Sequence, residues 1–166
     1  MYSIEKLSQN HVIQDFDCGL DKFSQYLKAY ALNDVERGRC TVYVLILMNE
    51  PKVVAGYFTL SPDKIRGAIL SNAQQRRLYN SDERPGILIG KIAIDKKHIG
   101  KKFSEVLLYS AQQTVLTLEV KSMAITIQAL TADLAEYYAK FGFEALPSNK
   151  LFLIKTLKRI AADFGS

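Results

Sequence analysis

The chain has 166 residues, a length typical of one domain with a sizeable hydrophobic core. Hydrophobic residues make up 48% of it and no apolar run is long enough to cross a bilayer, while the net charge of +5 suits an anionic cofactor or nucleic acid, or simply solubility. The first residues lack the features of a secretory signal, and the two cysteines form neither a disulfide framework nor a zinc pattern. We therefore expect a single domain over residues 1–166, cytoplasmic, with no membrane segment and no metal.

The first half of the chain predicts a strand, a helix and a hairpin. Residues 1–8 form the strand, and the capping-type turn Asp17-Cys18-Gly19 opens a helix over residues 19–32. Residues 40–48 and 53–61 are two β-rich runs around a short polar turn, the pattern of an antiparallel hairpin. The apolar face of the helix consists of Leu20, Phe23, Leu27 and either Tyr30 or Ala31.

The middle of the chain begins with polar residues 62–86, which we interpret as a short helix and a loop. The nearly continuous apolar run from Ile87 to Asp95 predicts a strand buried on both faces. A helix follows over about residues 102–118. The residues predicted to share one of its faces are Phe103, Val106, Leu107, Ser110, Ala111 and Val115.

The last part predicts a strand over residues 123–130, a helix over 132–141 that ends at Gly142, and a strand over 151–154. Residues 155–164 form a short terminal helix. The order β-α-β-β-β-α-β-α-β predicts an α/β protein of the α+β kind, with a mixed sheet and helices on both faces.

A basic loop joins the strand that ends at Asp95 to the helix that begins near Phe103. A helix N-terminus presents unpaired backbone N–H groups and the positive end of the helix dipole, which together favour an anion such as a pyrophosphate. The alternative is an ordinary solvated loop. The basic residues of the loop are Lys96, Lys97, His98, Lys101 and Lys102.

Tyr138 is the candidate catalytic side chain, because a phenol near the sulfur of a thioester can protonate the departing thiolate. The alternative is a core tyrosine, since pairs such as Tyr137-Tyr138 usually pack. His11 and His98 are far from any cluster of metal ligands in the sequence.

Four short motifs then occur in a family-specific order. They are Phe16-Asp17-Cys18-Gly19-Leu20, Gly56-Tyr57-Phe58-Thr59-Leu60, Lys91-Ile92-Ala93-Ile94-Asp95 and Tyr137-Tyr138-Ala139-Lys140-Phe141-Gly142-Phe143. On these motifs the chain resembles the GCN5-related N-acetyltransferases, the GNAT fold, over essentially its whole length. Within that superfamily it is most similar to the small bacterial toxins that acetylate the amino acid on charged tRNA.

The resemblance implies acetyl-CoA as co-substrate and direct attack of a primary amine on the thioester. It implies that the backbone of Ile92, Ala93 and Ile94 binds the pantetheine arm like an added strand, and that Tyr138 is the general acid. A backbone N–H of this strand would polarise the thioester carbonyl. The pyrophosphate would be bound by the loop residues Ile99, Gly100, Lys101, Lys102, Phe103 and Ser104.

This loop departs from the family pattern Arg/Gln-x-x-Gly-x-Gly/Ala, because Ile99, Lys102 and Ser104 stand at its characteristic positions. A Cβ at Lys102 restricts the backbone, whereas the ammonium attracts phosphates. We favour retained but weakened cofactor binding. The alternative is a degenerate GNAT domain that keeps the fold and serves as a binding or regulatory module.

Several acceptors remain open: aminoacyl-tRNA, as in the toxins, or a protein or small-molecule amine. The resemblance also implies neutralisation by a ribbon-helix-helix antitoxin and formation of a homodimer. The candidate RNA-contacting residues are Arg37, Arg39, Arg76, Arg77, Lys155, Lys158 and Arg159.

Overall fold

The computed structural model describes residues 1–66, 73, 83–118 and 122–165. They fall into two compact units, one made of Met1–Ser61 with Gly90–Ala111 and the other of Pro62–Ile89 with Gln112–Ser166. A strand pair and one helix contribute residues to both units. The single domain that the sequence predicts stays a prediction.

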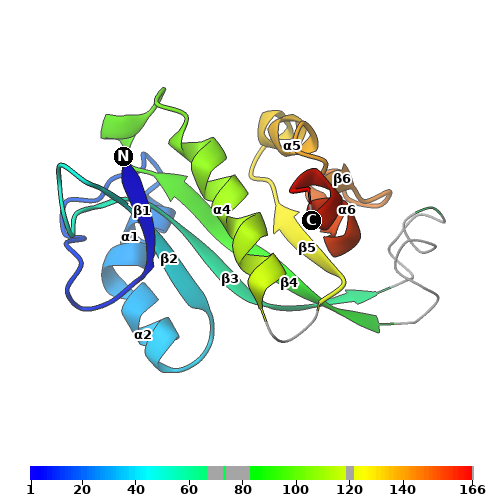
Figure 1. Ribbon diagram of the computed structural model, residues 1–166, viewed down its shortest axis with the longest axis horizontal. Helices are drawn as coiled ribbons and strands as arrows, with labels where there is room; N and C mark the ends of the chain where they lie inside the picture. The colour runs from blue at the N-terminus through cyan, green and yellow to red at the C-terminus, as the bar shows by residue number, and fades with distance from the viewer. Residues whose placement is uncertain (67–72, 74–82, 119–121, 166) are drawn as a thin grey trace. The chain divides into compact units, whose positions relative to one another are not determined.

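In the described part of the chain the strands are hydrogen-bonded in the order β1-β2-β3-β4-β5-β7-β6 (Figure 1). The β4–β5 pair is parallel, whereas β1–β2, β2–β3, β5–β7 and β6–β7 are antiparallel. This mixed, mostly antiparallel sheet confirms the predicted fold class. The strands are β1 (Tyr2–Lys6), β2 (Thr41–Leu47), β3 (Val54–Arg66), β4 (Glu83–Ile94), β5 (Ala124–Gln128), β6 (Glu144–Ala145) and β7 (Phe152–Thr156).

The helices follow the predicted order with shifted ends. One prediction was wrong: residues 19–32 are not a single helix, because the chain leaves helical geometry at Tyr30, where φ is −124°. The described helices are α1 (Asp21–Ala29), α2 (Ala31–Glu36), the 3₁₀ turn η2 (Lys96–His98), α4 (Phe103–Thr117), α5 (Ala132–Ala139) and α6 (Leu157–Asp163).

In the first unit, helices cover both faces of β3. On one face the Tyr57 hydroxyl donates a hydrogen bond to the carbonyl oxygen of Phe23 in α1, at 2.7 Å. On the other face lies Gly56, where an added Cβ would come within 3.2 Å of the Leu107 side chain of α4 and 2.7 Å of that of Ile94. Glycine is required at this position by close packing, and the prediction of helices on both faces holds within this unit.

The face of α1 was only partly predicted. Leu27 and Ala31 are buried in the core of this unit, with Phe23 packed against them. Leu20 and Tyr30 are 47% and 59% exposed. Of the alternatives Tyr30 and Ala31, it is therefore Ala31 that belongs to the buried face, and the prediction that Leu20 belongs to it was wrong. Leu20 precedes the helix and Tyr30 lies at the break after it, where the helical spacing no longer applies.

The second unit contains a parallel strand pair, an antiparallel pair and the helices α5 and α6 (Figure 1). Its apolar core includes Ile65, Ala124, Leu146 and Ile154. The prediction of a loop and helix for residues 62–86 was wrong at both ends: β3 continues to Arg66 and β4 begins at Glu83. Residues 67–72 and 74–82 lie outside the described part.

Two further sequence predictions needed correction. Strand β4 is not buried on both faces, because Ile87, Leu88, Ile92 and Ile94 keep intermediate exposure. The two-residue strand β6 was not predicted, since Glu144-Ala145 is too short to show a pattern. The face of α4 is confirmed in part: Leu107, Ala111 and Val115 are buried. Phe103, Val106 and Ser110 are only partly buried, and the buried Leu108 and Gln112 were not predicted.

Candidate functional site

The loop between β4 and α4 belongs to the first unit and begins with a buried carboxylate. Asp95 is 2% exposed, and its side chain accepts a hydrogen bond from the backbone N–H of Lys97 at 2.9 Å, which caps the turn η2. Its own N–H donates to the carbonyl oxygen of Ala55 in β3 at 2.8 Å. Strand β3 therefore fixes where the loop starts.

The backbone of the loop is left-handed at two residues. Gly100 has φ +88° and Lys102 has φ +63°, and only the first of them is a glycine. The Lys102 carbonyl oxygen accepts the hydrogen bond from Val106 at 3.3 Å, which begins α4. The first turn of an α-helix has N–H groups without partners inside the helix. The lysine thus adopts a left-handed conformation that glycine reaches without strain.

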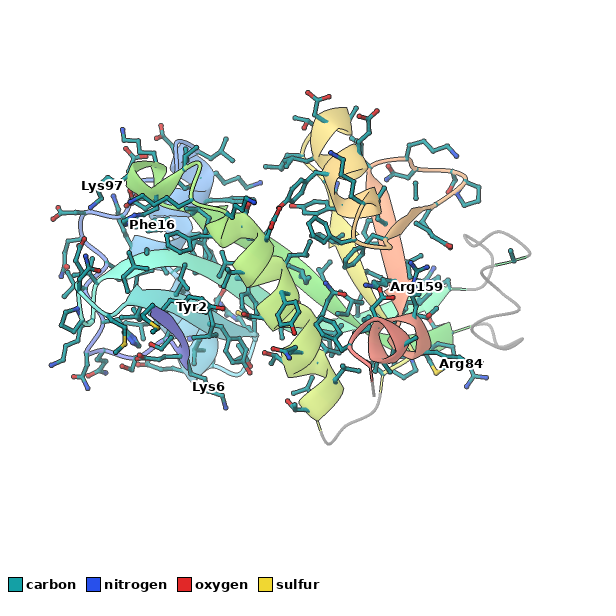
Figure 2. The ribbon with its side chains drawn as sticks, turned by 45° about the horizontal axis from the view of Figure 1, so that its top comes forward. Tyr2, Lys6, Phe16, Arg84, Lys97 and Arg159 are labelled. Carbon is teal, nitrogen blue, oxygen red and sulfur yellow. The ribbon has the colours of Figure 1, made fainter. Side chains whose placement is uncertain are left out.

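The five basic residues of the loop differ in their exposure to solvent. Lys97, Lys101 and Lys102 are exposed, and Figure 2 shows Lys97 on the turn after β4. His98 is buried, with its ring edge-to-face against Phe103 at a centroid distance of 5.9 Å. The interpretation of His98 as a phosphate-facing group was therefore wrong. Its imidazole packs under the loop instead.

Lys96 is engaged by the segment before α1. Its ammonium lies 2.8 Å from the Asp17 carboxylate, and this hydrogen bond lowers the pKa of Asp17 below its ordinary value. The backbone adds two contacts: the Lys96 N–H donates to the Asp17 carbonyl oxygen at 2.8 Å, and the Asp17 N–H donates to Asp95 at 3.2 Å. The turn Asp17-Cys18-Gly19 thus holds the basic loop as well as preceding the helix, a role that the sequence did not reveal.

Ile92, Ala93 and Ile94 form the last part of β4 in the first unit. The described register between β4 and β5 runs from Gly86 to Ile89 and does not reach these residues. That their backbone binds the pantetheine arm stays a prediction.

Tyr138 belongs to the second unit and lies near the end of α5. It is 6% exposed, and burial raises its pKa to about 12, with a smaller contribution from Tyr137. Its ring packs against Tyr137 at 5.7 Å and Phe143 at 6.4 Å. Burial explains the raised pKa, because a low-dielectric environment disfavours the charged phenolate.

Some of the candidate RNA-contacting residues are exposed to solvent and one is buried. Arg37, Arg39, Lys158 and Arg159 are exposed, and Figure 2 shows Arg159 on α6. Lys155 is 3% exposed, so its interpretation as an RNA contact was wrong. Arg76 and Arg77 lie outside the described residues.

Within the described ranges there is no cluster of three or more His, Cys, Asp or Glu side chains that could hold a metal ion. No helix described in the structure is both long and apolar enough to span a membrane.

No profile of a known protein family matches the chain. A tRNA-acetylating toxin of Mycobacterium tuberculosis (strain ATCC 25618 / H37Rv) is 26% identical over 164 residues, covering 96% of this chain and 95% of the toxin. AtaT, solved in complex with acetyl-methionyl-tRNAfMet, is 25% identical with a TM-score of 0.88, over 99% of both chains. A tyrosine-to-phenylalanine mutant of AtaT, solved with the C-terminus of the antitoxin AtaR and acetyl-CoA, is 22% identical with a TM-score of 0.81, over 99% of both chains.

The fold is thus that of a GNAT acetyltransferase, as the four motifs predicted. The resemblance to the tRNA-acetylating toxins is confirmed, and it extends over nearly the whole chain.

Proposed function

We propose that this chain is an acetyl-CoA-dependent N-acetyltransferase that acetylates the amino group of aminoacyl-tRNA. The observation that carries the proposal is the similarity, over 99% of both chains, to AtaT bound to acetyl-methionyl-tRNAfMet. The similarity to the tRNA-acetylating toxin of M. tuberculosis supports it independently at the level of sequence.

The residues of the first unit fit the co-substrate. The loop has left-handed backbone at Gly100 and Lys102, and turns of this kind can direct successive N–H groups at an anion. It also carries three exposed lysines, Lys97, Lys101 and Lys102. Acetyl-CoA supplies an acetyl group activated as a thioester. Ile92, Ala93 and Ile94 would bind the pantetheine arm through their backbone, and residues 99–104 would bind the phosphates. This geometry favours an active enzyme over a degenerate domain.

Tyr138 would act as the general acid. A phenol whose pKa is raised to about 12 stays protonated at neutral pH, so it can donate its proton to the leaving thiolate. The neutral amine attacks the thioester carbonyl, the C–N bond forms as the C–S bond breaks, and the thiolate takes the proton of Tyr138. The amine passes its surplus proton to water, and the Tyr138 phenolate regains a proton from water. No covalent intermediate on the chain is needed.

The wider biology follows from the same similarity. We expect the chain to act in the cytoplasm, where charged tRNA is found, to be neutralised by a ribbon-helix-helix antitoxin, and to dimerise. AtaT, solved as a mutant with the C-terminus of AtaR, is a precedent for such neutralisation.

The test is transfer of labelled acetyl groups from acetyl-CoA to a pool of charged tRNA, with the same tRNA deacylated as a control. Labelled N-acetyl-aminoacyl-tRNA is expected only with the charged pool. Tyr138→Phe should lower kcat about 100-fold, within the range of general-acid catalysis. Tyr137→Phe is the matched control on the same helix and should retain activity. Absence of transfer to any charged tRNA would refute the proposed acceptor, and equal activity of the two variants would remove Tyr138 from the mechanism.

A further inference from the structure

Lys155 is a buried lysine in the second unit, on β7. Its side chain is 2% exposed. Lysine is almost never fully buried unless its ammonium is paired, because removing the charge from water is costly. A buried ammonium that is retained in the fold therefore needs a full set of acceptors.

The ammonium of Lys155 has three acceptors, one for each of its N–H groups. Nζ donates to Gln112 Oε1 at 2.6 Å, to the Phe141 carbonyl oxygen at 2.7 Å and to Asp163 Oδ2 at 2.7 Å. The bond to Asp163 is also the first cause of the lowered pKa of that carboxyl. The acceptors come from α4, from the turn after α5 and from α6, so one side chain ties three elements to β7.

The contact with Phe141 reaches the turn that carries Tyr138. The Phe141 N–H donates to the Tyr138 carbonyl oxygen at 3.0 Å, so the turn bonded to Lys155 is continuous with the end of α5. The next residue, Gly142, has φ +91°, and an added Cβ there would lie 3.1 Å from Lys155 Cε. Glycine at this position therefore allows both the left-handed turn and the approach of the lysine.

The same ammonium borders the ring on which Tyr138 packs. Lys155 Nζ lies 5.8 Å from the centroid of the Phe143 ring, and the Tyr138 ring lies 6.4 Å from that centroid. Lys155 thus bonds to the backbone of Phe141, which follows Tyr138, and lies beside the Phe143 ring, on which the Tyr138 ring packs. Removing the ammonium group would disturb both contacts.

We propose that Lys155, held by Gln112 and Asp163, is a positioning residue that fixes the turn after α5 and thereby the orientation of the Tyr138 phenol. This inference rests on the proposed function for its effect on catalysis. A small displacement of a catalytic group lowers the rate strongly, whereas binding of a co-substrate by other residues is unaffected. The expected signature is a loss in kcat with an unchanged KM for acetyl-CoA.

The test compares Lys155→Met, which keeps most of the length and removes the charge, with Lys150→Met, an exposed lysine before β7 to which no part of the site is assigned. Lys155→Met should lower kcat about 10- to 100-fold and change the KM for acetyl-CoA less than about threefold. Lys150→Met should keep the wild-type kcat. Asp163→Asn keeps an acceptor and removes only the carboxylate charge, so it provides a milder variant with a smaller loss should Lys155→Met fail to fold.

A second measurement needs no turnover. The ring carbons of ¹³C-labelled tyrosine are followed by NMR against pH, and the Tyr138 signal is assigned by its loss in Tyr138→Phe. Wild-type Tyr138, with its pKa near 12, should not titrate below about pH 10.5, whereas a loosened and more exposed phenol should begin to titrate there, since the pKa of a free tyrosine is about 10.

A folded Lys155→Met or Asp163→Asn with wild-type kcat and an unchanged Tyr138 signal would overturn the proposal, whatever its melting temperature. If the wild type transfers no acetyl group, the proposed function fails. The NMR comparison then still decides whether Lys155 positions Tyr138.

Discussion

The left-handed backbone at Lys102 permits a test that separates conformation from charge. An L-residue other than glycine pays about 1–2 kcal/mol in this region, and Lys102 has φ +63°. Lys102→Gly removes the Cβ that causes the strain and also removes the ammonium. Lys102→Ala removes the ammonium and keeps the Cβ. The difference between the two variants therefore gives the backbone strain at Lys102 less the roughly 0.4–1 kcal/mol by which a glycine increases the entropy of the unfolded chain.

We expect Lys102→Gly to raise the free energy of unfolding by about 1 kcal/mol over Lys102→Ala, which for a chain of this size is about 2–4 °C in Tm. Urea unfolding and calorimetric melting measure it. Both variants should bind acetyl-CoA more weakly, by a similar factor of up to about tenfold, since a hydrogen bond to a charged group contributes about 1.5 kcal/mol or more. Lys102→Gly that is less stable than Lys102→Ala would refute the assignment of strain to this residue.

Three further predictions follow from the same contacts. Asp17→Asn should keep the fold and weaken acetyl-CoA binding several-fold in calorimetric titration, because the loop loses its ion pair with Lys96. The pKa of Asp17 is lowered in the folded protein. The ion pair is therefore intact above the ordinary carboxyl pKa of about 4 and is lost only as the pH falls through the lower pKa of the folded state. Gly142→Ala should lower the free energy of unfolding by about 2 kcal/mol or more, because it combines a left-handed φ of +91° with a contact of 3.1 Å to Lys155, and a urea midpoint equal to that of the wild type would contradict it. The pH–rate profile should rise as the attacking amine loses its proton and show no alkaline decline up to about pH 10, since Tyr138, with its pKa raised to about 12, keeps its proton throughout; a decline near pH 9 would contradict its role as general acid.

The sequence predicted the regular elements well where one local pattern determines them. The face of α4 with Leu107, Ala111 and Val115 follows from helical spacing, and the hairpin of β2 and β3 follows from two β-rich runs around a polar turn. The same spacing failed at Leu20 and Tyr30, because it assumes a continuous helix and the chain ends α1 at Ala29. Periodicity indicates which residues share a face only within the true limits of the element.

The sequence predicted those parts of the candidate site that depend on a short motif. It missed the contacts between residues that lie far apart in the sequence. Nothing near Lys155 in the sequence distinguishes it from the exposed Lys158, because its acceptors lie 43 and 14 residues before it and at Asp163. The contact between Asp17 and the loop after β4 is likewise invisible, since the two segments are 78 residues apart. Charge in the sequence suggested surface contacts for Lys155, His98 and Lys96. The fold instead buries Lys155 and His98 and pairs the exposed Lys96 with Asp17.

The glycine pattern of the loop describes backbone conformations, and Lys102 shows that the residue type can change while the conformation stays. At φ +63° the lysine keeps its backbone in the left-handed region, so the N–H groups of the loop keep the directions that a glycine would give them. The strain of about 1–2 kcal/mol is of the same order as the attraction between one ammonium and a phosphate. A lysine in this position can therefore offset in binding what it costs in folding. The departure from the glycine pattern is therefore compatible with retained binding of the co-substrate. The difference in stability between Lys102→Gly and Lys102→Ala, corrected for the entropy that glycine adds to the unfolded chain, gives the cost in folding.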